Sequence, residues 1–100
     1  MQQLTLLIFG IVLSALGVVN IRGDIRTIHS YNRRKVRRED IPAYGRAVGT
    51  GTLIIGAALI LSGIAAFWRE ELVAFIVLPA LAIGLAFMLY GQIRYNHGIF

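Results

Sequence analysis

The stretch AVGTGTLIIGAALILSGIAAFWREELVAFIVLPALAIGLAFMLYGQI, residues 47–93, carries charge at only one place, the triplet at residues 69–71. On either side of this triplet lies an uncharged run of 22 residues, 47–68 and 72–93. An α-helix of that length extends about 33 Å, enough to cross a hydrocarbon core about 30 Å thick. Because the triplet is so short, the two runs predict two membrane-spanning helices in a tight antiparallel hairpin.

The chain begins with a third uncharged run, residues 4–21. A cleaved signal peptide is the alternative, but no basic side chain precedes the run and two further spans follow it, so we expect a retained helix. The composition agrees, because 57% of the residues are hydrophobic and only 15% are charged, too few to cover a small water-soluble domain. The prediction is a single all-α integral membrane domain, residues 1–100, with three transmembrane helices.

The segment between the first two spans, residues 22–46, holds eight of the ten basic residues. Ile25, Ile28, Asn32 and Val36 recur at near-helical spacing, with arginines on the other faces. This pattern predicts an amphipathic helix at the membrane interface. Asp40 suits an N-cap and Pro42 suits a first helical turn, so the second long helix should begin near Ile41.

This basic segment also predicts the orientation. Basic loops stay in the cytoplasm, so the segment should share the inner side with the tail at residues 94–100, and the triplet should lie outside. The predicted topology is a multi-pass protein of the cell membrane with its N-terminus outside and its C-terminus cytoplasmic. Aromatic residues are expected at both interfaces: Trp68 at the outer one, and Tyr44 and Tyr95 at the inner one.

The basic run itself admits three interpretations. A nucleic-acid site is disfavoured, because Tyr31 is the one aromatic residue beside the run and two membrane spans tether it. A topology signal alone would need fewer charges, although this alternative stays open. We expect contact with anionic lipid of the inner leaflet, which attracts each basic side chain by about 1 kcal/mol. The residues predicted to contact lipid headgroups are Arg26, Arg33, Arg34, Lys35, Arg37 and Arg38.

Groups that could support catalysis or bind a metal are sparse. None of the three spans contains Asp, Glu, Lys, Arg or His, the groups that proton-coupled transporters place inside the membrane. His29 and His97 lack partners at metal-ligand spacing. A Ser-His-Asp grouping is not expected, because Ser14 and Ser62 lie in the apolar runs and the acids lie outside them. We therefore predict no catalytic residue, no metal site and no cofactor. Serine and threonine within the spans are expected to bond to carbonyls of their own helix.

Glycines in the second span recur every seven residues and therefore share one stripe of the helix. Small residues let helices approach closely, which is the main packing gain in lipid. Two alternatives are open for this stripe: packing within the hairpin of residues 47–93, or self-association between chains. The residues predicted to pack helices are Gly49, Gly56 and Gly63 in the second span, and Ala80, Gly84 and Gly91 in the third.

The stretch from Gly23 through Gly63, which includes IHSYNRRKVRREDIPAYGRAVGTGTLIIGAALILSG, resembles a family of small prokaryotic three-span membrane proteins, domain of unknown function 3784. The resemblance covers roughly the middle two-fifths of the chain. It implies one span, a polar loop, an acidic turn and a hydrophobic hairpin, and it implies no activity. Where many members carry a lysine- and glutamate-rich loop, this chain carries arginines. The matching positions are Ile28, Tyr31, Asn32, Glu39, Tyr44 and Gly49.

Together these patterns predict a small non-enzymatic integral membrane protein with a structural, regulatory or accessory role. Its expected partners are anionic lipids of the inner leaflet, with a second copy or a larger membrane protein possible and no nucleic acid. The alternative is a homo-oligomeric channel or transporter subunit, in which hydroxyl side chains of the second span face a pore: Thr50, Thr52 and Ser62.

Overall fold

The structure is a computed structural model that describes residues 2–23 and 36–96. Within these residues it contains three long helices and no strand. The helices are α1 (Gln2–Ile21), α3 (Ile41–Ala65) and α4 (Leu72–Tyr95), and the 3-10 turn η1 (Arg38–Asp40) leads into α3. Each long helix is long and apolar enough to cross a membrane. The predicted all-α fold with three candidate spans is therefore confirmed, and it is compatible with a multi-pass membrane protein.

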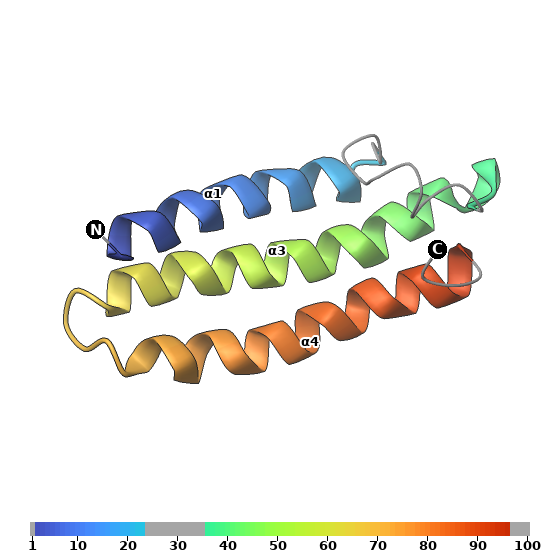
Figure 1. Ribbon diagram of the computed structural model, residues 1–100. Coiled ribbons are helices and arrows are strands. Elements are labelled where there is room, and N and C mark those ends of the chain that lie inside the picture. Colours follow the sequence, from blue (N-terminus) through green and yellow to red (C-terminus); the bar gives the residue numbers. More distant parts are fainter. Residues whose placement is uncertain (1, 24–35, 97–100) are drawn as a thin grey trace.

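The three helices lie side by side, with α3 between α1 and α4 (Figure 1). The molecule measures 46 × 20 × 18 Å, and its long axis matches a bilayer of about 40–45 Å including headgroups. The start of α1 and the α3–α4 connection lie at one end, called here the hairpin end. The end of α1, the start of α3 and the end of α4 lie at the other, called here the basic end.

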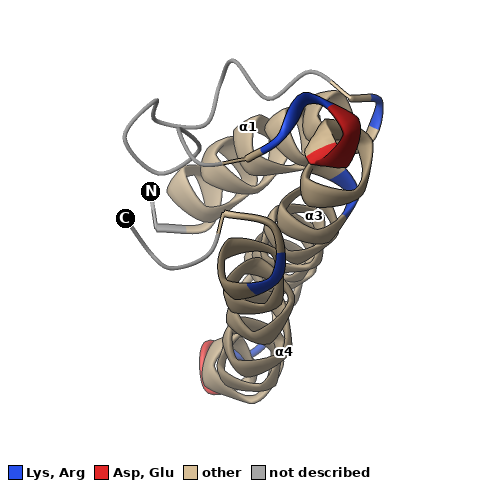
Figure 2. Ribbon diagram, turned by 90° about the vertical axis from the view of Figure 1, so that its right-hand side faces the viewer, with Lys and Arg blue, Asp and Glu red and all other residues tan. Residues whose placement is uncertain are grey.

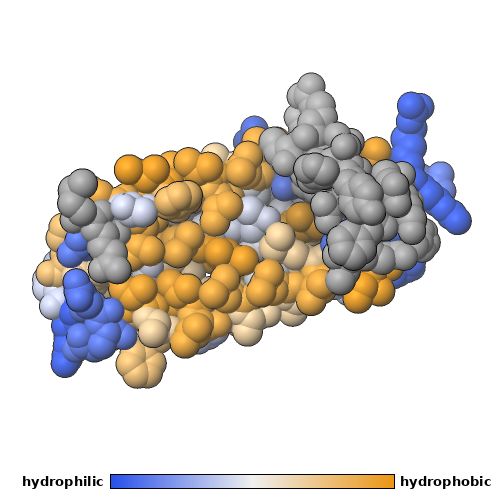
Figure 3. Space-filling view, viewed as in Figure 1, coloured by the Kyte–Doolittle hydropathy of each residue, from blue (hydrophilic) through white to orange (hydrophobic). Residues whose placement is uncertain are grey.

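The outward faces of the helices are apolar. Large side chains such as Ile8 on α1 and Phe75 on α4 are 61% and 76% exposed, and Figure 3 shows a broad hydrophobic surface between polar ends. Soluble monomers rarely expose continuous apolar surface of this extent. Trp68 is also exposed, at the hairpin end, as an aromatic residue at a membrane interface should be.

The two ends of the basic segment have defined geometry. After α1, Gly23 adopts a positive φ of 104°, and its N–H donates to the Asn20 carbonyl at 3.0 Å, an ending typical of a helix followed by glycine. Before α3, the chain is already helical at Asp40, with φ −92° and ψ −8°, and its side chain makes no capping hydrogen bond. The start of α3 at Ile41 agrees with the prediction, but Asp40 does not cap it by its side chain, since that geometry needs extended backbone.

The hairpin connection is longer than the sequence predicts. The uncharged run continues to Trp68, but α3 ends at Ala65 and residues 66–68 form turns. The Phe67 N–H donates to the Ile64 carbonyl at 3.2 Å and the Trp68 N–H to the Ala65 carbonyl at 3.0 Å. The last turn expected for α3 is therefore part of the connection, which runs over residues 66–71. At the other end α4 begins at Leu72 as predicted and continues to Tyr95.

The glycine stripe of α3 packs against α1. A Cβ added to Gly49 would lie 2.6 Å from the Gly17 carbonyl oxygen, and one added to Gly56 would lie 2.6 Å from the Ser14 nitrogen. A Cβ on Gly63 would lie 2.9 Å from Leu7 Cγ. The stripe is therefore covered by α1 and does not face α4.

The reason is that α1 carries a matching pair of glycines that sequence reasoning missed. Gly10 and Gly17 are also seven residues apart. A Cβ added to Gly10 would lie 2.7 Å from the Ile60 nitrogen, and one added to Gly17 would lie 2.8 Å from the Gly49 carbonyl oxygen, so both would clash with the α3 backbone. Equal repeats on two helices let several close backbone contacts occur in register.

The hairpin itself packs through a different face of α3. A Cβ on Gly51 would meet the Gly84 carbonyl oxygen, and one on Gly91 would lie 3.1 Å from Val48 Cγ2. Gly84 and Gly91 therefore face α3, whereas Ala80 is half-buried. Gly51 was missed because it falls outside the seven-residue repeat. The helix α3 is central because it presents small residues on two faces.

Candidate functional site

Charge is segregated between the two ends of the described chain (Figure 2). The hairpin end has one arginine and two glutamates, and Arg69 Nε donates to Glu71 Oε1 at 2.9 Å. The basic end has five arginines against two acids, Glu39 and Asp40. The five are all exposed: Arg22, Arg37, Arg38, Arg46 and Arg94.

Two of the predicted headgroup residues lie in this exposed group. Arg37 and Arg38 stand at the entry to η1, and Arg37 Nη1 lies 3.9 Å from Glu39 Oε1. The side chains of Arg37 and Glu39 are 68% and 75% exposed. This ion pair therefore contributes little to stability, and Arg37 can bind another anion in place of Glu39. The other predicted headgroup residues lie outside the described residues, as does most of the predicted amphipathic segment: Arg26, Arg33, Arg34 and Lys35.

A buried polar contact joins α3 and α4 at the basic end. Tyr44 is completely buried, and its hydroxyl donates to Gln92 Oε1. Val36, Ile41 and other side chains pack around Tyr44 and Val48. The expectation of Tyr44 as an interfacial belt residue is therefore wrong. Its ring fills the junction of the helices, and a buried tyrosine needs a hydrogen-bond partner, which the glutamine supplies. The sequence signal for this contact was a lone glutamine near the end of the last span.

Hydroxyls within the spans mostly bond to their own helix, as predicted. Thr52 Oγ1 donates to the Val48 carbonyl at 2.9 Å, and Ser62 Oγ donates to the Leu59 carbonyl at 3.0 Å. Ser14 differs, because among the described residues its Oγ is buried without a hydrogen-bond partner. Two of the three hydroxyls proposed for a pore are thus engaged within α3, and the third, Thr50, lines a groove.

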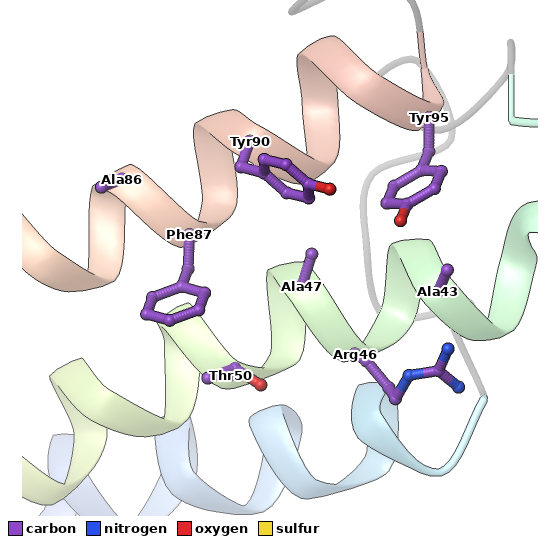
Figure 4. Close-up of a pocket in the computed structure, with 8 residues that line it drawn as sticks. All are labelled: Ala43, Arg46, Ala47, Thr50, Ala86, Phe87, Tyr90 and Tyr95. Atoms are coloured by element: carbon purple, nitrogen blue, oxygen red, sulfur yellow. The ribbon is translucent and has the colours of Figure 1, made fainter.

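This groove opens between α3 and α4 near the basic end and is called here the α3–α4 groove. Its volume is about 490 Å³, within the range of about 300–1,000 Å³ common for ligand sites. Figure 4 shows the rings of Phe87 and Tyr95 extending from α4 toward α3. The lining is three alanines, three aromatic residues, one threonine and one arginine: Ala43, Ala47, Ala86, Phe87, Tyr90, Tyr95, Thr50 and Arg46.

The described residues include no group of three or more histidine, cysteine, aspartate or glutamate side chains that could hold a metal ion. Their acidic side chains lie at the two ends of the molecule, and none of them lines the α3–α4 groove, although Asp40 is close enough to the groove residue Tyr95 to interact with it electrostatically. The chemistry that this part of the chain offers is therefore an apolar surface bounded by arginines.

Comparison with protein-family models, with curated proteins and with solved structures found no match for this chain. The resemblance at residues 23–63 accordingly stays a prediction from the sequence.

Proposed function

We propose that this chain is a small non-enzymatic protein of the cell membrane with a structural, regulatory or accessory role, whose basic end engages anionic lipid headgroups. The observation that carries the proposal is that the charged side chains lie at the two ends of an apolar body, with most of the arginines at one end. Five exposed arginines gather at the basic end, and a hydrophobic surface separates them from the hairpin end (Figure 3).

Electrostatics supports both the partner and the orientation. A leaflet rich in anionic lipid attracts each nearby basic side chain by about 1 kcal/mol, and this attraction fades within a Debye length of about 8–10 Å. Arg37 and Arg38 stand at the start of the candidate span Arg38–Ala65 and are exposed, which supports an attraction of this kind at the membrane surface. Basic residues near span ends also favour the cytoplasmic side.

The proposed topology places the basic end in the cytoplasm. Reporter fusions after Phe100 and after Glu71 are expected to report cytoplasmic and external positions, respectively, because nine of the ten basic residues lie in the segment at 22–46 and the tail. Paired reporters that are active on opposite sides of the membrane provide the control. An external position for the Phe100 fusion would contradict the orientation.

Lipid engagement is tested on the wild-type protein in vesicles. With the basic end facing outward, proteolysis within residues 22–46 is expected to be slower on vesicles that contain phosphatidylglycerol than on phosphatidylcholine vesicles. High salt should remove the difference, since it screens exposed charges. The cleavage rate at the same site in detergent provides the reference. Equal rates on both vesicles at low salt would leave the basic segment as a topology signal only.

A further inference from the structure

We propose that the α3–α4 groove binds one anionic phospholipid from the leaflet at the basic end, with an acyl chain along its alanines and the phosphate on Arg46. This inference rests on the proposed function, since it needs the basic end to lie at a leaflet surface. It goes beyond that function by assigning a discrete site between α3 and α4, which uses only Arg46, the last residue of the basic segment.

The floor and walls of the groove suit an acyl chain. Ala43 and Ala47 are one turn apart on α3, so they leave a shallow track along the helix, and Ala86 widens it from α4. Phe87 and Tyr90 are 42% and 54% exposed, which leaves their apolar ring surface available to a chain. On the membrane side of Arg46, where Ala47 and Ala86 line the groove, the track faces hydrocarbon in a bilayer, and a lipid chain is the occupant already present at that depth.

The polar end of the groove suits a phosphate. Within residues 2–23 and 36–96, no acidic side chain forms an ion pair with Arg46. Figure 4 shows its side chain extending toward the basic end, on the side of the α3 ribbon opposite the rings of Tyr90 and Tyr95. A long basic side chain can keep its stem in hydrocarbon and its head at the interface. The planar guanidinium can donate two parallel hydrogen bonds to phosphate oxygens.

A second arginine flanks the same wall from the other helix. The Arg94 Cζ atom lies 5.6 Å from the centroid of the Tyr95 ring, and this ring lines the groove. Tyr90 and Tyr95 meet edge to face, with centroids 6.1 Å apart, so two amphipathic rings form the wall where chain and headgroup meet. Arginines on both helices give the site a charge that selects an anionic lipid over a neutral one.

Quenching by brominated lipids tests the site. A Phe87→Trp variant in a Trp68→Phe background carries its single tryptophan on the groove wall, while Leu89→Trp in the same background is the control. Leu89 lies on the same helix and is 45% exposed, against 42% for Phe87, but it does not line the groove. The measured quantity is the affinity for dibrominated phosphatidylglycerol divided by the affinity for dibrominated phosphatidylcholine. At position 87 this ratio is expected to be about five, because one arginine attracts an anionic lipid by about 1 kcal/mol. At position 89 the ratio should be near one.

The Arg46→Gln change is expected to bring the ratio at position 87 close to the ratio at position 89, and Arg46→Lys should keep part of the preference. Because Arg46 is exposed, neither change should disturb the fold. An equal ratio at positions 87 and 89 in the wild-type background overturns the site, since the lipid would then form only a diffuse shell. A tryptophan at position 87 that neither lipid quenches also overturns it, because a second chain or a partner helix would cover the groove.

The two proposals fail separately. Lipid-independent proteolysis within residues 22–46 would count against the proposed function while leaving the quenching ratio at position 87 intact. A ratio that survives Arg46→Gln but disappears when the other basic residues of segment 22–46 are neutralised would assign lipid selection to those residues and overturn the groove site.

Discussion

Leucine in place of Gly56 is expected to separate α1 from α3 and to destabilise the protein by about 3 kcal/mol or more, at the upper end of the usual cost of overpacking. A Cβ at this position would already lie 2.5 Å from Ser14 Oγ and 2.6 Å from the Ser14 nitrogen. The second of these atoms is backbone and cannot rotate away, so whole helices must move. In lipid the lost contact is not replaced by a hydrophobic gain, because the bilayer is as apolar as the packed side chains.

Ala57→Leu is the matched control, because Ala57 is the neighbouring residue on α3 and is exposed. It should change stability by only a few tenths of a kcal/mol, as surface substitutions usually do. Reversible unfolding in mixed micelles, followed by helical circular dichroism or by a cross-link between α1 and α3, measures both variants. Equal tolerance at positions 56 and 57 would show that the glycine stripe faces lipid and would refute the packing of α1 on α3.

Neutralising the centre of the basic segment is expected to have the second large effect. Changing its five central basic residues to glutamine should remove up to about 5 kcal/mol of attraction to an anionic leaflet, at roughly 1 kcal/mol for each charge and less after screening. Proteolysis of the segment on phosphatidylglycerol vesicles should then reach the rate seen on phosphatidylcholine, and co-purified anionic lipid should fall. The five positions are Arg33, Arg34, Lys35, Arg37 and Arg38.

Topology should survive this change, since Arg22, Arg26 and Arg46 remain on the same side. A second variant with lysine at the four arginine positions keeps the charge and should keep the slow proteolysis, because attraction to the leaflet depends on charge. If the glutamine variant and the wild type were cut at the same rate on both kinds of vesicle, the segment would have no role beyond orientation.

Sequence reasoning worked best for properties that belong to a single segment. The three apolar runs are long enough to cross a bilayer wherever they pack, and the start of α3 at Ile41 follows from the residues beside it. The predicted end of α3 at residue 68 was one turn too late, because α3 ends at Ala65. An uncharged run shows which residues a membrane helix can contain, but it does not show where the chain turns. Tyr44 was expected at the membrane interface because tyrosine is common there. Its burial could not be predicted locally, since its hydrogen-bond partner Gln92 lies 48 residues away in the sequence.

The sequence by itself determined the number of candidate spans, the helical hairpin and the gathering of arginines near one end, because the transfer of an apolar run into lipid depends on that run alone. Only the tertiary structure decided that the stripe of Gly56 meets α1, that Gly51 meets α4, and that Arg46 borders a groove with Tyr95. These facts depend on how each helix is rotated about its own axis. That rotation is set by close packing against neighbours, since an apolar helix in lipid has no polar face to orient it.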